Sequence, residues 1–229
     1  MLNFFKKPKI NSPTDVRNKA FVIGLYQDTG LNYPTAKHDL AWSTRKKHLD
    51  FLHNMVIALK PKVVFETGTF EAHGTYAIAA AAHANNNGAQ IFTVDYDGDP
   101  IQDKEGTVSH EEWLELKAIR AANLDRIKTE FPNCQVRFVE GDSREVLPEL
   151  LKDIDQWDFW YQDSMHFAEG IQQEWDIMEA KSAPNPTIIF DDVSRRNGFS
   201  RWFTRKYKKS WIYTPRRDFD HKQCLAQKR

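Results

Sequence analysis

Hydrophobic residues along this chain follow two spacings: short continuous runs, and longer stretches in which they recur every three or four positions. Between residues 43 and 59 they recur at helical spacing, which predicts one amphipathic helix that Pro61 ends. Beyond it, short apolar runs bounded by turn formers predict five strands. These strands cover residues 62–66, 90–95, 136–139, 157–161 and 187–190.

Segments of helical pattern separate the predicted strands. They cover residues 72–84, 110–130, 143–152 and 167–181. Strands that alternate with helices of this length form βαβ units, which predicts an α/β fold with a doubly wound, mostly parallel sheet and helices on both faces. After residue 190 the rhythm changes, and runs at 210–213 and 222–226 predict a C-terminal antiparallel hairpin on the sheet edge. The sheet would then have seven strands.

The length of 229 residues suits a single α/β domain with additions. We expect residues 61–229 to form the ligand-binding domain. Residues 1–60, which contain the first helix and many turn formers, are predicted to cap it on the substrate side.

Composition narrows the classes of partner. Lys plus Arg and Asp plus Glu both number 32, so no net charge draws the protein to nucleic acid or to an anionic membrane. The basic, aromatic segment 195–209 is interpreted as aromatic rings packed on the sheet with their cations in water. Two distant cysteines without metal-ligand spacing, and no apolar run long enough to span a bilayer, predict a cytoplasmic protein.

Acidic residues stand at the end of nearly every predicted strand. They are Glu66, Asp95, Asp142, Asp163, Asp191 and Asp192. In an open parallel sheet, ligands bind outside the carboxyl ends of the strands, so these carboxylates should share one rim. Each could alone be a helix cap or a solvated residue. Together these carboxylates would repel one another unless ligands or cations balance their negative charge.

The first strand leads into a turn that contains Gly68, where the backbone can bend sharply and approach a ligand. Gly68 and Gly74 lack the partner glycine of the dinucleotide fingerprint, which argues against NAD. A carboxylate directly before this turn also suits a cationic ligand better than a pyrophosphate.

These motifs resemble the class I S-adenosylmethionine (SAM)-dependent methyltransferases. Glu66-Thr67-Gly68-Thr69 is similar to their motif I, and Gly141-Asp142-Ser143 to their adenine-side motif. The segment from Asp163 to Gly170, with Ile188 to Asp192, resembles the small-molecule and sugar O-methyltransferase branch of catechol and macrolide-sugar type. The position of the second motif I glycine is Ala72 here.

The resemblance implies SAM as the cofactor. Glu66, Gly68 and Thr69 would then lie beside it, Asp95 would bind the ribose hydroxyls, and Asp142 with Ser143 would lie on the adenine side. We expect residues 97–109 to form a lid or substrate loop.

Asp163, Asp191 and Asp192 close neighbouring strands about 4.8 Å apart and can therefore converge on one hard cation. Carboxylates without thiolates suit Mg²⁺, or else Mn²⁺ or Ca²⁺. The resemblance implies that the metal binds a substrate hydroxyl and that Asp163 is catalytic. His166 is the candidate general base; its alternative role is a helix cap.

The sequence therefore predicts a SAM-dependent O-methyltransferase that acts on a small-molecule or sugar hydroxyl with help from a divalent metal. Three alternatives stay open: a metal-independent methyltransferase, a non-catalytic SAM- or nucleotide-binding module, and a Rossmann-type oxidoreductase without its glycines. A homodimer is left open beside a monomer.

Overall fold

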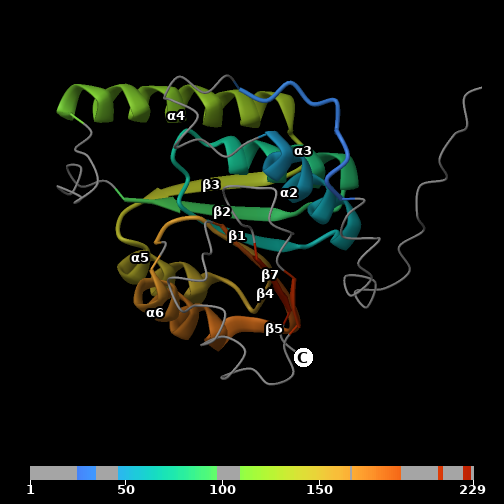
Figure 1. Ribbon diagram of the computed structural model, residues 1–229, viewed down its shortest axis with the longest axis vertical. Coiled ribbons are helices and arrows are strands. Elements are labelled where there is room, and N and C mark those ends of the chain that lie inside the picture. Colours follow the sequence, from blue (N-terminus) through green and yellow to red (C-terminus); the bar gives the residue numbers. More distant parts are fainter. Residues whose placement is uncertain are drawn as a thin grey trace, which may run out of the picture.

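The computed structural model of the chain describes residues 25–34, 46–96, 109–165, 167–191, 211–213 and 224–227. It has the predicted α/β architecture, in which a central sheet lies between two layers of helices (Figure 1). Five strands run parallel, and each lies within two residues of a predicted run except for the start of the last. They are β1 (Val63–Thr67), β2 (Gln90–Asp95), β3 (Gln135–Glu140), β4 (Trp157–Gln162) and β5 (Ser182–Phe190).

The strand order is β3-β2-β1-β4-β5-β7-β6. Because the chain proceeds from β1 to one side and then returns to place β4 on the other, the carboxyl ends of β1 and β4 flank the switch point where ligands bind in such sheets. At the far side, β7 (Cys224–Gln227) pairs antiparallel with β5, and β6 (Trp211–Tyr213) pairs antiparallel with β7. The residues between β6 and β7 are not among those described, so a direct hairpin connection stays a prediction.

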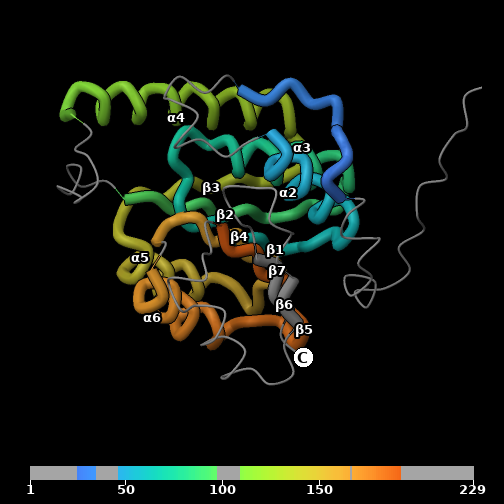
Figure 2. The backbone as a smooth tube through the Cα atoms, viewed as in Figure 1, coloured from blue at the N-terminus to red at the C-terminus, as the bar shows by residue number. Residues whose placement is uncertain are grey.

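Helices cover both faces of the sheet, as Figures 1 and 2 show. On one face lie α2 (Lys46–Leu59), α3 (His73–Asn85) and α4 (His110–Glu130). On the other lie α5 (Ser143–Leu150) and α6 (Ala168–Met178), which short 3-10 turns extend at residues 151–153 and 179–181. A capping box between Ser109 and Glu112 begins α4 at the predicted residue.

Each face of the sheet has its own hydrophobic core. The first joins α2 and α3 to β1, with Leu52, Met55 and Ile78 among the buried residues. Since α2 shares this core with α3, the described part of the predicted N-terminal cap packs directly on the domain; the domain boundary at residue 60 stays a prediction. The second core lies under α5 and α6 and contains three fully buried tryptophans, of which Trp160 and Trp175 stack with ring centroids 6.2 Å apart.

Strand β5 begins at Ser182, five residues before the predicted start. The sequence pattern does not predict this part of the strand because it contains Pro184 and Pro186, and proline lacks the N–H that a central strand donates. The pairing with β4 is irregular there: Trp157 pairs with Ser182, and the register then shifts to Phe159 with Thr187.

Several predicted features lie outside the described residues. They are the start of the N-terminal cap, loop residues 97–108, His166, Asp192 and the basic segment 195–209. None of the helices in the described part of the chain has the length and apolar character needed to cross a lipid bilayer.

Candidate functional site

The turn after β1 lies against the chain that leaves β4. Gly68 has φ +91°, and its N–H donates to the Val94 carbonyl at 2.8 Å. A Cβ atom added here would collide with the backbone carbonyl of Asp163. Glycine is therefore needed both for the backbone conformation and for the close approach of the two backbone segments, at Gly68 and at Asp163, beside the switch point. The sharp turn predicted from Gly68 is present.

Thr69 and Glu66 from the same motif direct their side chains into the protein. The Thr69 hydroxyl is 2.6 Å from that of Thr93. The Glu66 carboxylate is fully buried beneath α3, where it accepts hydrogen bonds from the Thr75 hydroxyl and, at 2.6 Å, from Thr93. Burial raises the pKa of Glu66 to about 7, although both hydroxyls oppose the rise. Direct contact of these two side chains with a cofactor stays a prediction.

Asp95, at the end of β2, is held by groups from three segments. One oxygen accepts from the Phe70 N–H at 2.9 Å and from the Arg120 guanidinium, and the other accepts from the Tyr96 N–H at 2.9 Å. Burial raises the pKa of Asp95, while Arg120 opposes the rise. The side chain keeps 17% of its surface exposed, and among the described residues Oδ1 has one donor for its two lone pairs. It can therefore accept a further hydrogen bond from a ligand hydroxyl.

Basic side chains from α4 and α5 form ion pairs with the acids at the ends of β2 and β3. Arg120 also lies 3.5 Å from Glu140 at the end of β3, and Lys117 lies 2.8 Å from the same carboxylate. The Arg144 side chain bonds to Asp142, and this bond lowers the pKa of Asp142. The repulsion expected among the strand-end acids is thus relieved by the protein itself for β2 and β3.

Asp142 and Ser143 begin α5. Asp142 is the N-cap and accepts from the Arg144 N–H at 2.9 Å, as its position in the sequence predicted. Its side chain keeps 20% of its surface exposed. The Ser143 hydroxyl instead donates into the protein, to Glu174 at 2.5 Å. A contact of Ser143 with a cofactor would therefore involve its backbone.

Two of the predicted metal ligands lie together. The Tyr161 hydroxyl is 3.0 Å from a carboxylate oxygen of Asp163 and 3.0 Å from one of Asp191. His48, from α2, lies 3.9 Å from the other oxygen of Asp191. One phenol has a single proton, so it cannot donate fully to both acids.

The donor chemistry at this place suits a hard cation, because two carboxylates from adjacent strands converge. Within the described ranges no set of three or more His, Cys, Asp or Glu side chains has the arrangement of a metal site. The third predicted ligand, Asp192, lies outside those ranges, so the three-carboxylate site stays a prediction.

Four residues that the sequence analysis did not single out shape this rim: His48, Arg120, Tyr161 and Glu174. For Glu174 a signal was available. It lies on α6 among the buried Ile171, Trp175 and Met178, so it is a charged residue within the apolar stripe of a helix. For the others no local pattern distinguishes them from ordinary packing or surface residues.

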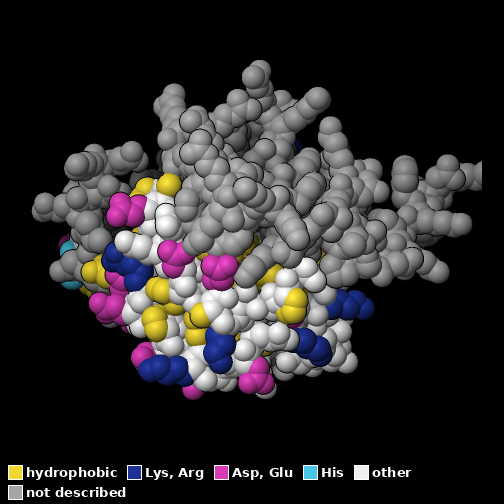
Figure 3. Space-filling model, turned by 90° about the horizontal axis from the view of Figure 1, so that it is seen from below, with side chains coloured by type: hydrophobic (Ala, Val, Ile, Leu, Met, Phe, Trp, Pro, Cys, Tyr) yellow, Lys and Arg dark blue, Asp and Glu magenta, His cyan; other side chains and the backbone are white. Residues whose placement is uncertain are grey.

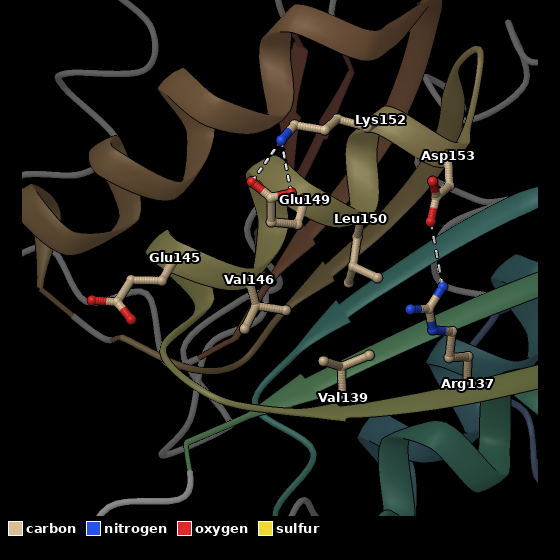
Figure 4. A pocket seen from close by; sticks show the side chains of 8 residues that line it. All are labelled: Arg137, Val139, Glu145, Val146, Glu149, Leu150, Lys152 and Asp153. Carbon is tan, nitrogen blue, oxygen red and sulfur yellow. Dashed lines mark hydrogen bonds and ion pairs between the residues drawn. The ribbon is translucent and has the colours of Figure 1, made fainter.

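Two other regions of the described surface give weaker indications of a binding site. Figure 3 shows a face on which basic and acidic side chains are interspersed, without a broad patch of one sign on its described part. A hollow of about 340 Å³ lies between β3 and α5, with Val139, Val146 and Leu150 at its floor and charged side chains around it (Figure 4). No residue predicted to bind a cofactor or a metal lines it.

Comparison with known proteins adds two findings. A family model described as a methyltransferase domain matches residues 65–193, more than half of the chain, including the ends of β1 to β5. No curated protein sequence matches the chain.

Solved structures match the fold over most of the chain. The O-methyltransferase TomG from Streptomyces achromogenes, solved with SAM, is 12% identical, with 81% of each chain covered and a TM-score of 0.61. An O-methyltransferase from Bacillus cereus, solved with S-adenosylhomocysteine (SAH), is 14% identical, with 92% of this chain and 90% of that chain covered and a TM-score of 0.60. The SAH-bound methyltransferase PaMTH1 from Podospora anserina is 14% identical, with 97% and 98% covered and a TM-score of 0.57. At these identities the likeness establishes the fold.

Proposed function

This chain belongs to the methyltransferase-domain family, and from that premise we propose that it transfers the methyl group of SAM to a hydroxyl oxygen of a small molecule or sugar. The observation that carries the proposal is the extent of the family match, from Phe65 to Val193, which spans both sides of the switch point. SAM as the methyl donor is supported by structural neighbours solved with SAM or SAH, and hydroxyl oxygen as the acceptor by neighbours described as O-methyltransferases.

The cofactor is assigned to the rim between β2 and β3. The partly exposed carboxylate of Asp95 has acceptor capacity for a ribose hydroxyl, and Arg120 with two backbone N–H groups fixes its orientation. Tyr96, with 43% of its surface exposed, provides a flat apolar surface beside Asp95 for the purine. Asp142 begins α5 on the far side, so the adenosine would lie between Asp95 and Asp142.

The methionine end of the cofactor is assigned to the turn at Gly68. Because this turn packs directly on the Asp163 carbonyl, a sulfonium placed here lies close to the ends of both β1 and β4. A substrate oxygen on the β4–β5 side would then face the methyl group, and alignment of the two supplies much of the catalysis.

In the transfer, a lone pair on the substrate oxygen forms the new O–C bond. The S–C bond breaks with its electron pair returning to sulfur, which yields SAH, and the hydroxyl proton leaves to a base. Asp163 and His166 are the proposed groups for holding the hydroxyl and accepting that proton.

Asp163 and Asp191, with Asp192, are the residues that would hold a divalent cation such as Mg²⁺. When bound, such an ion lowers the pKa of a hydroxyl that it contacts. A metal-independent transfer, in which His166 or an aspartate acts without an ion, is the second candidate. Loss of activity in EDTA, restored by Mg²⁺, favours the first mechanism.

Calorimetry with SAH, SAM and NADP tests the assignment of the cofactor. We expect SAH and SAM to bind and NADP not to bind. An Asp95→Asn variant should bind SAH at least about tenfold more weakly, since it loses the charged acceptor. Asp125→Asn, an exposed acid on α4, is the matched control and should bind normally. Binding of NADP alone, or equal SAH affinity in both variants, contradicts the assignment.

SAH release in the presence of a panel of catechols, other phenols and sugars tests the reaction itself. Methylation of a nitrogen or carbon acceptor, and not of any hydroxyl, would contradict the proposed acceptor while leaving the family intact.

A further inference from the structure

Glu174 is a fully buried acid on α6 that accepts hydrogen bonds from three other elements of the fold. One of its carboxylate oxygens accepts from the hydroxyls of Ser143, at 2.5 Å, and Ser164, at 2.6 Å. The other accepts from the Gln162 amide at 3.2 Å and the Thr67 hydroxyl at 3.4 Å. Thr67 and Gln162 end strands, Ser164 lies in the turn after β4, and Ser143 is the first residue of α5.

These donors come from segments that the sequence separates widely. Thr67 ends β1 just before Gly68, Ser143 follows the N-cap of α5, and Ser164 follows Asp163. One side chain therefore joins the end of β1, the start of α5 and the turn after β4. The Trp160 indole N–H extends the network, because it lies 3.3 Å from the Thr67 hydroxyl.

A carboxylate at this position is costly unless it does something that an apolar residue cannot. The buried neighbours of Glu174 on α6 are apolar, and its hydrogen-bond partners among the described residues are three hydroxyls and an amide. Arg144 interacts with Glu174 only through longer-range electrostatics. Burial accordingly raises the pKa of Glu174. An apolar residue here would pack on Trp175 and its neighbours but could not accept from three turns at once.

We infer that Glu174 is a positioning residue that couples the turn on the adenosine side, residues 141–143, to the turn that bears Asp163. This inference rests on the proposed function and adds a residue to its site. Glu174 touches neither cofactor nor substrate in this account. It acts by holding Ser143 and Ser164 at a common point, so that the two turns keep the relative placement that aligns the cofactor with the acceptor.

The test compares SAH affinity with stability in three variants on one face of α6. Glu174→Ala removes the acceptor and should raise the SAH Kd about tenfold and lower kcat by about ten- to hundredfold. Glu174→Gln should recover SAH affinity to within about threefold of wild type, because the amide oxygen still accepts and the serine hydroxyls can reverse to accept from the amide nitrogen. Met178→Ala, one helical turn after Glu174 at the end of α6, creates a cavity but removes none of the four hydrogen bonds to Glu174. It should lower Tm and leave the SAH Kd unchanged.

A second measurement covers the case in which Glu174→Ala does not fold. Ser143→Ala and Ser164→Ala each remove one hydrogen bond to the same carboxylate oxygen. If Glu174 couples the turns, both variants weaken SAH binding and the double variant is non-additive. Additive effects, or no effect of Ser164→Ala, overturn the inference.

The outcomes separate the inference from the function on which it rests. Wild-type protein that binds no SAH overturns both. Wild-type protein that binds SAH, with a folded Glu174→Ala variant of equal affinity, overturns the positioning role and leaves the proposed methyltransferase reaction standing.

Discussion

The guanidinium of Arg120, on α4, bonds to the carboxylate of Asp95, at the end of β2. Both side chains are largely buried, with 5% and 17% of their surface exposed. The guanidinium also lies over the Phe138 ring, 4.8 Å from its centroid. This ion pair fixes the acid that is assigned to the ribose, and it explains how one strand-end carboxylate is tolerated without a ligand.

Replacement of this arginine should therefore be costly. Arg120→Met keeps most of the side-chain volume but leaves Asp95 without its cation, and we expect a loss of about 3 kcal/mol in the free energy of unfolding. Lys117→Met breaks the more exposed pair with Glu140 and should cost less than about 1 kcal/mol. Urea unfolding of both variants checks the difference. Equal small losses would show that the buried pair contributes no more than a surface pair.

The pKa of Glu66 predicts a dependence of stability on pH. Its pKa rises from 4.5 to about 7 in the folded protein because the group is buried. Between these values the folded state holds the proton and the unfolded state releases it, so stability falls as pH rises and levels off above about pH 7. The loss amounts to about 3 kcal/mol.

Glu66→Gln removes this titration. The amide oxygen can accept from Thr75 and Thr93 as the carboxylate does. We expect the variant to show a flatter stability profile between pH 5 and 7, and to equal or exceed wild type at pH 8. Unfolding measured across that range, with Glu149→Gln as an exposed control on α5, provides the check. Parallel profiles for wild type and Glu66→Gln would rule out a raised pKa at Glu66.

Gly68→Ala should disrupt the switch point. The new methyl group would meet the Asp163 carbonyl, and the residue would also be held at positive φ. We expect a loss of more than about 2 kcal/mol in stability and undetectable SAH binding. Gly88→Ala is the matched control: its φ is +67° with open space around the site, so only the backbone strain of about 1 kcal/mol remains. SAH titration and thermal melts of both variants distinguish steric collision from strain.

Asp163→Ala tests the reaction side of the rim. Asp163 lies partly exposed after β4, and its removal leaves the sheet intact, so the variant should fold. We expect turnover to fall to background with SAH binding retained, as measured by SAH release and calorimetry. Activity near that of wild type would eliminate the proposed role of Asp163 and, with it, the metal-assisted mechanism.

The sequence alone determined the order and type of the elements from α2 to β5. Strand and helix periods are local properties, and the βαβ alternation leaves few arrangements of a parallel sheet. It also placed Gly68, Asp95, Asp142 and Asp163 at or just after the carboxyl ends of strands, which is where the structure has them. The beginning of β5 was missed because Pro184 and Pro186 resemble a loop locally, and only pairing with β4 makes them part of a strand.

Tertiary structure decided what each rim side chain does. Glu66 and Asp95 both end a run of apolar residues, yet one points beneath α3 and the other toward Arg120. Both residues lie on the same face of the sheet, because Glu66 pairs with Thr93 and Asp95 follows Thr93 by two positions. The difference therefore depends on which distant helix covers each residue. The same holds for Glu174, whose four donors lie up to 107 positions away from it in the sequence. Local patterns carry no information about such contacts, since they exist only once the helices are packed on the sheet.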